Sequence, residues 1–94
     1  MIVTQERLSE LVAVEREKGL TLAMANGCFD LLHVGHIRYL RGAAAEADRV
    51  IVAVNDDQSV EALKGQGRPL HPASERAEIV EAFEMVDYVV LFSS

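Results

Sequence analysis

Two histidines that flank a glycine are the residues best suited to bind an anion. His33 and His36 stand on either side of Gly35 in the segment 26–36, which we expect to join a strand to a helix. Imidazole N–H groups and the unpaired backbone N–H groups of a helix N-terminus donate hydrogen bonds to phosphate, and a glycine lets the ligand approach closely. The spacing therefore predicts a phosphate site. The alternative is that His33 only caps the helix and His36 is an ordinary helical residue.

Asp30 and Cys28 lie in the same segment and allow other interpretations. Asp30 could orient a magnesium-bound water, or it could form an Asx turn with its own loop. Cys28, His33 and His36 offer a spacing for a metal ion, with four residues and then two residues between them. Structural zinc normally has four ligands in recognisable pairs, and there is no second cysteine, so we expect no metal site and a packed Cys28.

A second group of candidate residues is basic. Lys64, Arg68 and Arg76 lie between acidic stretches, and residues 77–94 contain acidic residues but no Lys or Arg. Glycines on both sides of Gln66 allow the loop to move, so its cations could close over bound phosphates. We expect these three side chains to contact phosphate; the alternative is a solvated loop.

The motifs of several enzyme classes are absent from the sequence. It contains no Ser-His-Asp order, no phosphate-binding loop of the G-x-x-x-x-G-K-[ST] type and no G-x-G-x-x-G fingerprint. A reaction that needs only charge stabilisation fits these residues better. If a phosphate monoester attacks the α-phosphate of a nucleotide, the nucleophile is already anionic, so this reaction needs no general base. Histidines, cationic side chains, a helix N-terminus and Mg²⁺ could stabilise the charge that develops on the transferring group.

The segments that must position these residues alternate between helices and strands. Apolar residues recur at helical or strand spacing, and Gly, Asn and Pro separate the segments. In the last helix we expect Ile79, Ala82, Phe83 and Val86 to face the core. We expect helices over residues 4–18, from 35 or 36 to 47, from 56 or 57 to 63 and from 72 to 86, and strands over 20–25, 50–54 and 88–92.

This alternation predicts the α/β class, with an open parallel Rossmann-like sheet in a single domain over residues 1–94. Ligands of such sheets bind beyond the carboxyl ends of the strands, so the segments after Ala25 and Val54 should open into one site. The apolar strand at 88–92 has no expected neighbour on its outer edge. We therefore expect either dimerisation at that edge or a chain that is part of a larger domain.

Composition excludes several classes of partner. The chain has 94 residues, half of them hydrophobic, with a net charge of −6 and a single cysteine. An acidic chain is poorly suited to bind nucleic acid or an anionic membrane. A single cysteine cannot form an internal disulfide. The N-terminal residues resemble neither a signal peptide nor a membrane span, so we expect a cytoplasmic protein.

The segment 26–40 resembles the H-x-G-H signature of the cytidylyltransferase-like nucleotidyltransferase superfamily. Its start, Asn-Gly-Cys-Phe-Asp, is most similar to the heptose 1-phosphate adenylyltransferase domain of ADP-heptose synthases, although Ala25 stands where Thr is usual. Further matches follow in the same order at residues 54–57, 59–60, 63–65, 68–69, 76 and 86–90. The family domain continues with more strands and a Ser/Thr-rich motif, so we expect this chain to be its N-terminal portion.

The resemblance implies transfer of AMP from ATP to a sugar 1-phosphate, with heptose 1-phosphate as the expected acceptor and Mg²⁺ accompanying ATP. From the open sheet edge we also expect a homodimer. One alternative is a cytidylyltransferase that acts on glycerol phosphate or another alcohol phosphate. The other is a non-catalytic module that binds nucleotide and dimerises. By position, the resemblance implies catalytic roles for His33, His36 and Lys64, and nucleotide or phosphate binding by Asn26, Gly27, Cys28, Phe29, Asp30, Gly35, Asp56, Arg68 and Arg76.

Overall fold

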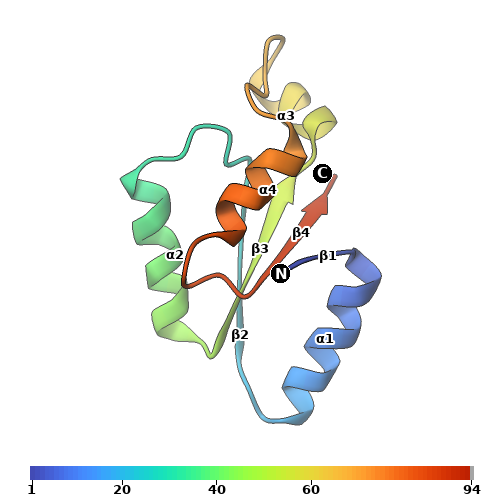
Figure 1. The fold of residues 1–94 in the computed structure, drawn as a ribbon, viewed down its shortest axis with the longest axis vertical. Helices are drawn as coiled ribbons and strands as arrows, with labels where there is room; N and C mark the ends of the chain where they lie inside the picture. The colour runs from blue at the N-terminus through green and yellow to red at the C-terminus, as the bar shows by residue number, and fades with distance from the viewer. Residues whose placement is uncertain (94) are drawn as a thin grey trace.

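The sheet is built around the most apolar strand of the chain. The computed structural model describes residues 1–93, so Ser94, the last residue of the predicted domain, lies outside the described residues. In chain order the elements are β1 (Ile2–Val3), α1 (Gln5–Glu17), β2 (Leu22–Gly27), α2 (Val34–Glu46), β3 (Arg49–Asn55), α3 (Asp57–Lys64), α4 (Ala73–Glu81) and β4 (Tyr88–Phe92) (Figure 1). All strands pair in parallel, in the order β1-β4-β3-β2. The predicted open parallel α/β sheet is confirmed.

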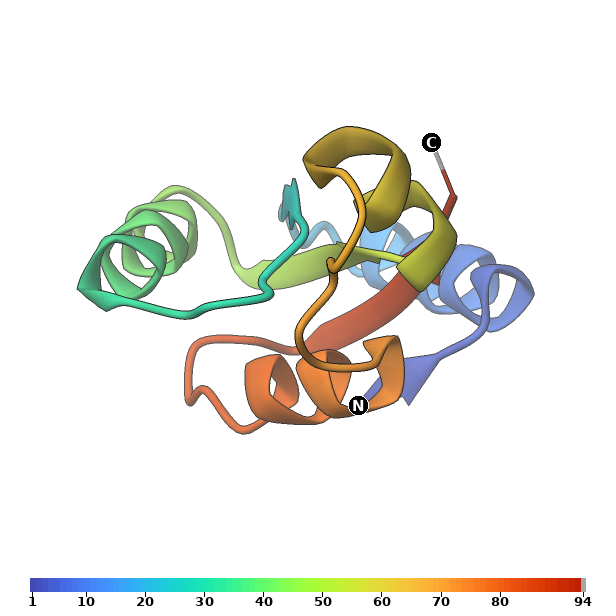
Figure 2. The same cartoon turned by 90° about the horizontal axis from the view of Figure 1, so that it is seen from above.

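Helices cover both faces of β3, which explains its uninterrupted apolar sequence. On one face, Val50, Val52 and Val54 pack with Leu40 of α2 and Val80 of α4. On the other face, Leu8 of α1 packs in a smaller cluster with Ile51, Ala53 and Val90. Figure 2 shows α2 and α1 toward opposite ends of the molecule, with α4 between them.

The N-terminal residues form a strand that the sequence analysis missed. Ile2 pairs with Val89 and Val3 with Val90, so β1 covers part of the outer edge of β4. The expectation of a bare edge at β4 was therefore wrong, and within residues 1–93 the longer unpaired edge belongs to β2. Two residues before a helix carry too little periodicity to predict such a strand.

The last helix is shorter than expected. α4 ends at Glu81, and Ile79 is 45% exposed, because Ala77 and Val80 fill the side of the helix that faces the sheet. Ala82 is also exposed. The predicted core positions for Ile79 and Ala82 were wrong, whereas Val86 is buried in the segment that leads into β4. No helix among residues 1–93 is long and apolar enough to cross a membrane.

Candidate functional site

A cleft of about 580 Å³ opens at the carboxyl ends of β2 and β3, where the sequence analysis placed the site. In Figure 1 the arrowheads of β3 and β4 point toward α3, and Leu63 and Lys64 at the end of that helix line the cleft. The cleft is lined by Gly27, Cys28, Phe29, Asp30, Leu31, His33, His36, Asn55, Leu63, Lys64 and Arg68. A hollow of similar size between α2 and residues 82–85 contains none of the predicted site residues.

The rings of His33 and His36 lie side by side at the start of α2, and each accepts a hydrogen bond from a nearby backbone N–H. Nδ1 of His33 accepts a hydrogen bond from the backbone N–H of Gly35 at 3.0 Å, and Nδ1 of His36 accepts one from the backbone N–H of His33 at 3.1 Å. A ring nitrogen that accepts a hydrogen bond carries no proton, so we assign the proton of each neutral ring to Nε2. The ring centroids are 4.2 Å apart, and both rings line the cleft. The alternatives for His33 are thus combined, because the ring caps the helix through one nitrogen and retains an N–H donor on the other.

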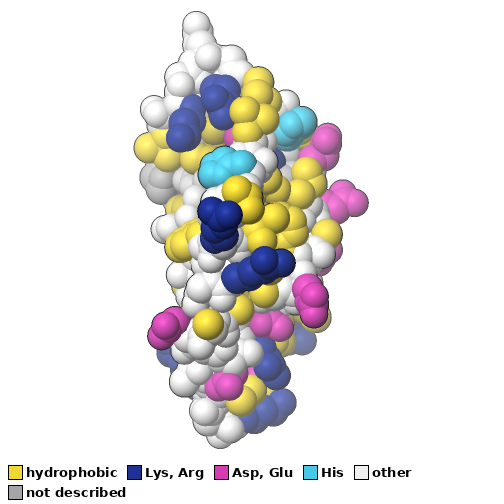
Figure 3. All heavy atoms as spheres, turned by 90° about the vertical axis from the view of Figure 1, so that its left-hand side faces the viewer, with side chains coloured by type: hydrophobic (Ala, Val, Ile, Leu, Met, Phe, Trp, Pro, Cys, Tyr) yellow, Lys and Arg dark blue, Asp and Glu magenta, His cyan; other side chains and the backbone are white. Residues whose placement is uncertain are grey.

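The surroundings of His36 affect its charge state. Burial lowers the pKa of His36 from its ordinary value, and the proximity of His33 lowers it further. The ring of Phe29 also lies close, with its centroid 5.4 Å from that of His36. His36 is therefore mainly a neutral hydrogen-bond donor near pH 7. Figure 3 shows one histidine side chain between Lys and Arg side chains above and below it, and a second histidine beside an acidic side chain.

Two glycines permit this arrangement. A Cβ atom at Gly35 would lie 2.7 Å from Cε1 of His33, so only glycine lets that ring fold over the helix start. A Cβ atom at Gly27 would lie 3.1 Å from the ring of Phe29. Phe29 itself is buried and has a φ of 51°, a left-handed conformation that is uncommon for an aromatic residue. The turn after β2 is thus tightly constrained, as is common at functional sites.

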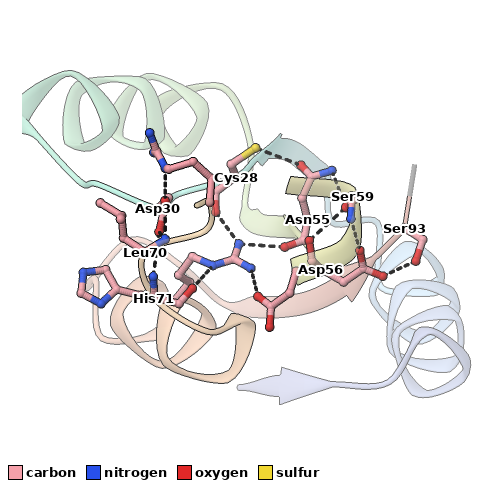
Figure 4. A network of polar contacts seen from close by, with 11 residues as sticks. Cys28, Asp30, Asn55, Asp56, Ser59, Leu70, His71 and Ser93 are labelled. Carbon is pink, nitrogen blue, oxygen red and sulfur yellow. Dashed lines mark hydrogen bonds and ion pairs between the residues drawn. The ribbon is translucent and has the colours of Figure 1, made fainter. Parts of the chain in front are cut away.

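Asp30 lines the cleft, but its carboxylate is engaged with a distant part of the chain. It accepts hydrogen bonds from the backbone N–H groups of Leu70 and His71 and from Nε of Arg68 (Figure 4). Burial raises the pKa of the Asp30 carboxyl, but these hydrogen bonds outweigh burial and hold the pKa at about 2. The partners lie about 40 residues away along the chain, so the predicted Asx turn was wrong. The carboxylate is also too fully engaged to hold a magnesium-bound water in this arrangement.

Arg76 lies beneath the cleft and not within it. The guanidinium is fully buried and donates to three backbone carbonyl oxygens, those of Cys28 at 2.6 Å, Asn55 at 2.7 Å and His71 at 2.9 Å. It also donates to Oδ1 of Asp57 at 2.7 Å. A phosphate cannot reach a side chain with no exposed surface, so the structure does not support the predicted phosphate contact. Arg76 instead ties the carboxyl ends of β2 and β3 to the start of α4.

Lys64 and Arg68 line the cleft, as the sequence analysis expected for the basic loop. Lys64 is exposed in the last turn of α3, and the side chain of Arg68 is 32% exposed. Gly65 and Gly67 have φ values of 97° and 87°, in the region that favours glycine. The exposed loop therefore brings two cationic groups to the cleft that contains both histidines.

Asn26 and Asp56 do not line the cleft. Asn26 is exposed and points to the opposite face of the sheet, beside a hollow of about 410 Å³ next to α1. Asp56 caps α3 by accepting from the backbone N–H of Ser59, and the Ser93 hydroxyl donates to its other oxygen. Hydrogen bonds from Ser93 and Ser59 lower the pKa of Asp56, with the bond from Ser93 contributing most. The structure therefore gives no support for a nucleotide contact by either side chain.

Three residues of the cleft were missed by the sequence analysis. Asn55 is the last residue of β3, and its position at the carboxyl end of a strand was the signal that could have identified it. Leu31 and Leu63 also line the cleft, although exposed leucines in a loop and at a helix end carry no such signal. Among residues 1–93, no group of three or more His, Cys, Asp or Glu side chains is arranged to hold a metal ion.

Comparison with known proteins identifies relatives over nearly the whole chain. Proteins named Bifunctional protein HldE from Alkalilimnicola ehrlichii and Photobacterium profundum are 49% and 47% identical over 92 residues. These matches cover 98% of this chain but 19% of each relative, so the chain spans about a fifth of their length.

A solved structure has a similar fold. It is described as the lipopolysaccharide core biosynthesis protein from Thermoplasma volcanium GSS1, and it superposes with a TM-score of 0.72 at 29% sequence identity. The match covers 78% of this chain and 58% of the other. A sequence profile described as cytidylyltransferase-like matches residues 24–94, which include the cleft residues after β2, the basic loop and β4. The chain therefore belongs to the cytidylyltransferase-like family.

Proposed function

We propose that this chain forms the nucleotide-binding part of a nucleotidyltransferase that transfers AMP from ATP to a sugar 1-phosphate. The expected acceptor is heptose 1-phosphate, and the proposed role is in ADP-heptose and lipopolysaccharide core biosynthesis. Family membership and the similarity to a solved lipopolysaccharide core biosynthesis protein support this proposal. Because ATP is available in the cytoplasm, we place the reaction there.

The structural observation that supports this proposal is the orientation of the two histidine rings in the cleft. The two histidine rings that line the cleft each use Nδ1 to accept a backbone N–H, which directs an Nε2–H donor to other partners. Two adjacent donors at the N-terminus of a 13-residue helix suit the oxygens of a phosphate group. Lys64 and Arg68 add positive charge at the same cleft.

In the proposed reaction, an oxygen of the sugar phosphate attacks the α-phosphorus of ATP. A new bond forms between that oxygen and phosphorus, the bond to the β-phosphate bridge breaks, and pyrophosphate leaves with the electron pair. The nucleophile is already ionised, so no residue needs to remove a proton. We expect His33 and His36 to stabilise the charge on the transferring phosphoryl oxygens, and Lys64 and Arg68 to bind the other phosphates.

We expect Mg²⁺ to enter as part of the MgATP substrate. The Asp30 carboxylate already accepts from three donors, and the described residues contain no cluster of metal-ligating side chains. The donor set of the cleft is instead cationic and suits the phosphate oxygens that carry the ion. Bound Mg²⁺ would neutralise charge on the leaving pyrophosphate.

Calorimetric titration of the folded chain with MgATP and, separately, MgCTP tests this proposal. We expect saturable ATP binding that is tighter than CTP binding and that His33→Ala weakens at least about tenfold, since one charge-assisted hydrogen bond is lost. The matched control is His71→Ala, because the exposed His71 side chain does not line the cleft. Thermal unfolding of each variant shows whether it is folded.

Equal affinity of the wild type and His33→Ala would remove that ring from the site, and a folded chain that binds neither nucleotide would contradict the proposal. The second candidate is a cytidylyltransferase that uses an alcohol phosphate, since the matching family is named for cytidylyl transfer. Tighter binding of MgCTP than of MgATP would favour it. We also expect a homodimer, which sedimentation at several concentrations would test; a monomer at all concentrations would contradict it.

A further inference from the structure

The segment 68–71 is held from two sides by buried polar side chains. The backbone N–H groups of Leu70 and His71 donate to the Asp30 carboxylate at distances between 2.8 and 3.0 Å. On the other side of the segment, Nε of Arg76 donates to the carbonyl oxygen of His71 at 2.9 Å. Figure 4 shows these contacts as one network between the turn after β2 and the start of α4.

Asp30 also fixes a side chain that reaches the cleft. Nε of Arg68 donates to Oδ2 of Asp30 at 2.7 Å, and the two side chains are 32% and 2% exposed. A hydrogen bond through Nε leaves the two terminal amino groups of a guanidinium available for further acceptors. Both residues line the cleft, but the carboxylate is buried against the segment 68–71, whereas the guanidinium that it holds is only half-buried.

The chain just before Arg68 does little to position that side chain. Residues 64–67 are exposed, and the two glycines among them have positive φ values. Glycine-rich exposed backbone has high conformational entropy, so it does not restrict the direction of the next side chain. The contacts with Asp30 and Arg76 supply that restriction.

We propose that Asp30 is a positioning residue for nucleotide binding: its carboxylate anchors the segment 68–71 and thereby holds the Arg68 guanidinium at the cleft. The inference rests on the proposed function, because it takes the ligand of the cleft to be a nucleotide with its phosphates. Asp30 acts through Arg68 and does not touch the ligand. Such preorganisation lowers the entropy cost of each hydrogen bond that Arg68 makes to phosphate.

The direction in which replacement of Asp30 changes MgATP affinity distinguishes a positioning role from a simple electrostatic effect. Removing a negative charge beside a polyanion site should tighten the binding of an anion. If Asp30 positions Arg68, its removal should weaken binding instead. Asp30→Asn is a suitable change because it has nearly the same shape but loses the charge and one acceptor oxygen.

The first arm of the test is calorimetric titration of MgATP at low and high salt. We expect Arg68→Gln to weaken binding about tenfold, as loss of a charge-assisted hydrogen bond to phosphate predicts. Asp30→Asn should weaken it to a similar extent, and the double variant should bind no more weakly than Arg68→Gln. Both single variants should also show a smaller salt dependence than the wild type.

The matched control is Asp48→Asn. Its carboxylate likewise accepts a backbone N–H, that of Thr21 at 2.8 Å, but it lies at the amino ends of the strands, away from the cleft. We expect this variant to bind MgATP as the wild type does. Unchanged or tighter binding by Asp30→Asn would overturn the inference, and so would effects of Asp30→Asn and Arg68→Gln that multiply in the double variant.

The second arm does not depend on nucleotide. Amide hydrogen exchange of Leu70 and His71 should accelerate at least tenfold in Asp30→Asn and stay unchanged in Asp48→Asn. Unchanged exchange in Asp30→Asn would overturn the anchoring role even if nucleotide binds. If the folded wild type binds neither MgATP nor MgCTP, the proposed function fails and the inference falls with it, whatever the exchange rates are.

Discussion

Replacing Arg76 with methionine should destabilise the fold by about 3 kcal/mol. The fully buried guanidinium satisfies the carbonyl oxygens of Cys28, Asn55 and His71. Leaving a buried acceptor without a donor costs on the order of 1–3 kcal/mol, and removal of the buried charge itself offsets part of the sum. Asp57 is 52% exposed and can be hydrated, so its lost ion pair adds little.

A loss of this size is a large fraction of the roughly 5–15 kcal/mol that stabilises a typical domain. Urea unfolding followed by far-UV circular dichroism measures it, since the chain contains no tryptophan for fluorescence. The free energy of unfolding of Arg76→Lys should lie between those of the wild type and Arg76→Met, because an ammonium group cannot span all three carbonyl oxygens. The control is Arg38→Met, at an exposed position of α2, which should change the free energy by less than about 0.5 kcal/mol. A loss below about 1 kcal/mol for Arg76→Met would refute the reasoning.

Further outcomes are expected at the histidine pair and at Asp30. Gly35→Ala should weaken MgATP binding about tenfold by displacing the ring of His33 and its hydrogen bond, whereas Gly42→Ala in the same helix has open space and should leave binding unchanged while raising stability by roughly 1 kcal/mol. Proton NMR titration should place the pKa of His36 below 6.5; its contribution to stability is present above pH 6.5 and lost as pH falls through that lowered pKa, and a midpoint at or above 6.5 would contradict its burial. The pKa of Asp30 is lowered from 3.8 to about 2, so its contribution should be present above about pH 4 and be lost toward pH 2. In urea unfolding at low pH, Asp30→Asn should show a smaller loss over that range, and an identical loss would contradict this assignment.

Much of the fold was predictable because helices and parallel strands have local sequence patterns. The apolar run from Val50 to Val54 indicated a strand that is buried on both faces, and it became the central part of β3. The alternation of elements then limited the topology to a parallel sheet with its site at the carboxyl ends of the strands. The exposure of Ile79 was harder to predict from the sequence, since helical spacing does not reveal where a helix ends.

The candidate site was predicted in part, because residue types and their spacing are also local features of the sequence. His33, His36, Lys64 and Arg68 carry types and spacings that indicate anion binding, and all line one cleft. Arg76 has the same charge and lies nearby in sequence, but its side chain turns inward to backbone carbonyl groups. A residue type does not reveal this difference, because a guanidinium binds a phosphate and a carbonyl oxygen through the same donors.

The sequence alone determined most of the helices and strands, apart from β1 and the end of α4, and it indicated the short motif that lines the cleft, since periodicity and turn residues act over a few neighbouring positions. Only the tertiary structure decided how the side chains between those segments are used. Asp30 meets Leu70 at a separation of 40 residues, and Arg76 meets Cys28 at a separation of 48. Those contacts depend on which loops the parallel crossovers bring to the same edge of the sheet. For that reason a carboxylate and a guanidinium that the sequence assigns to the ligand are used to hold the cleft together.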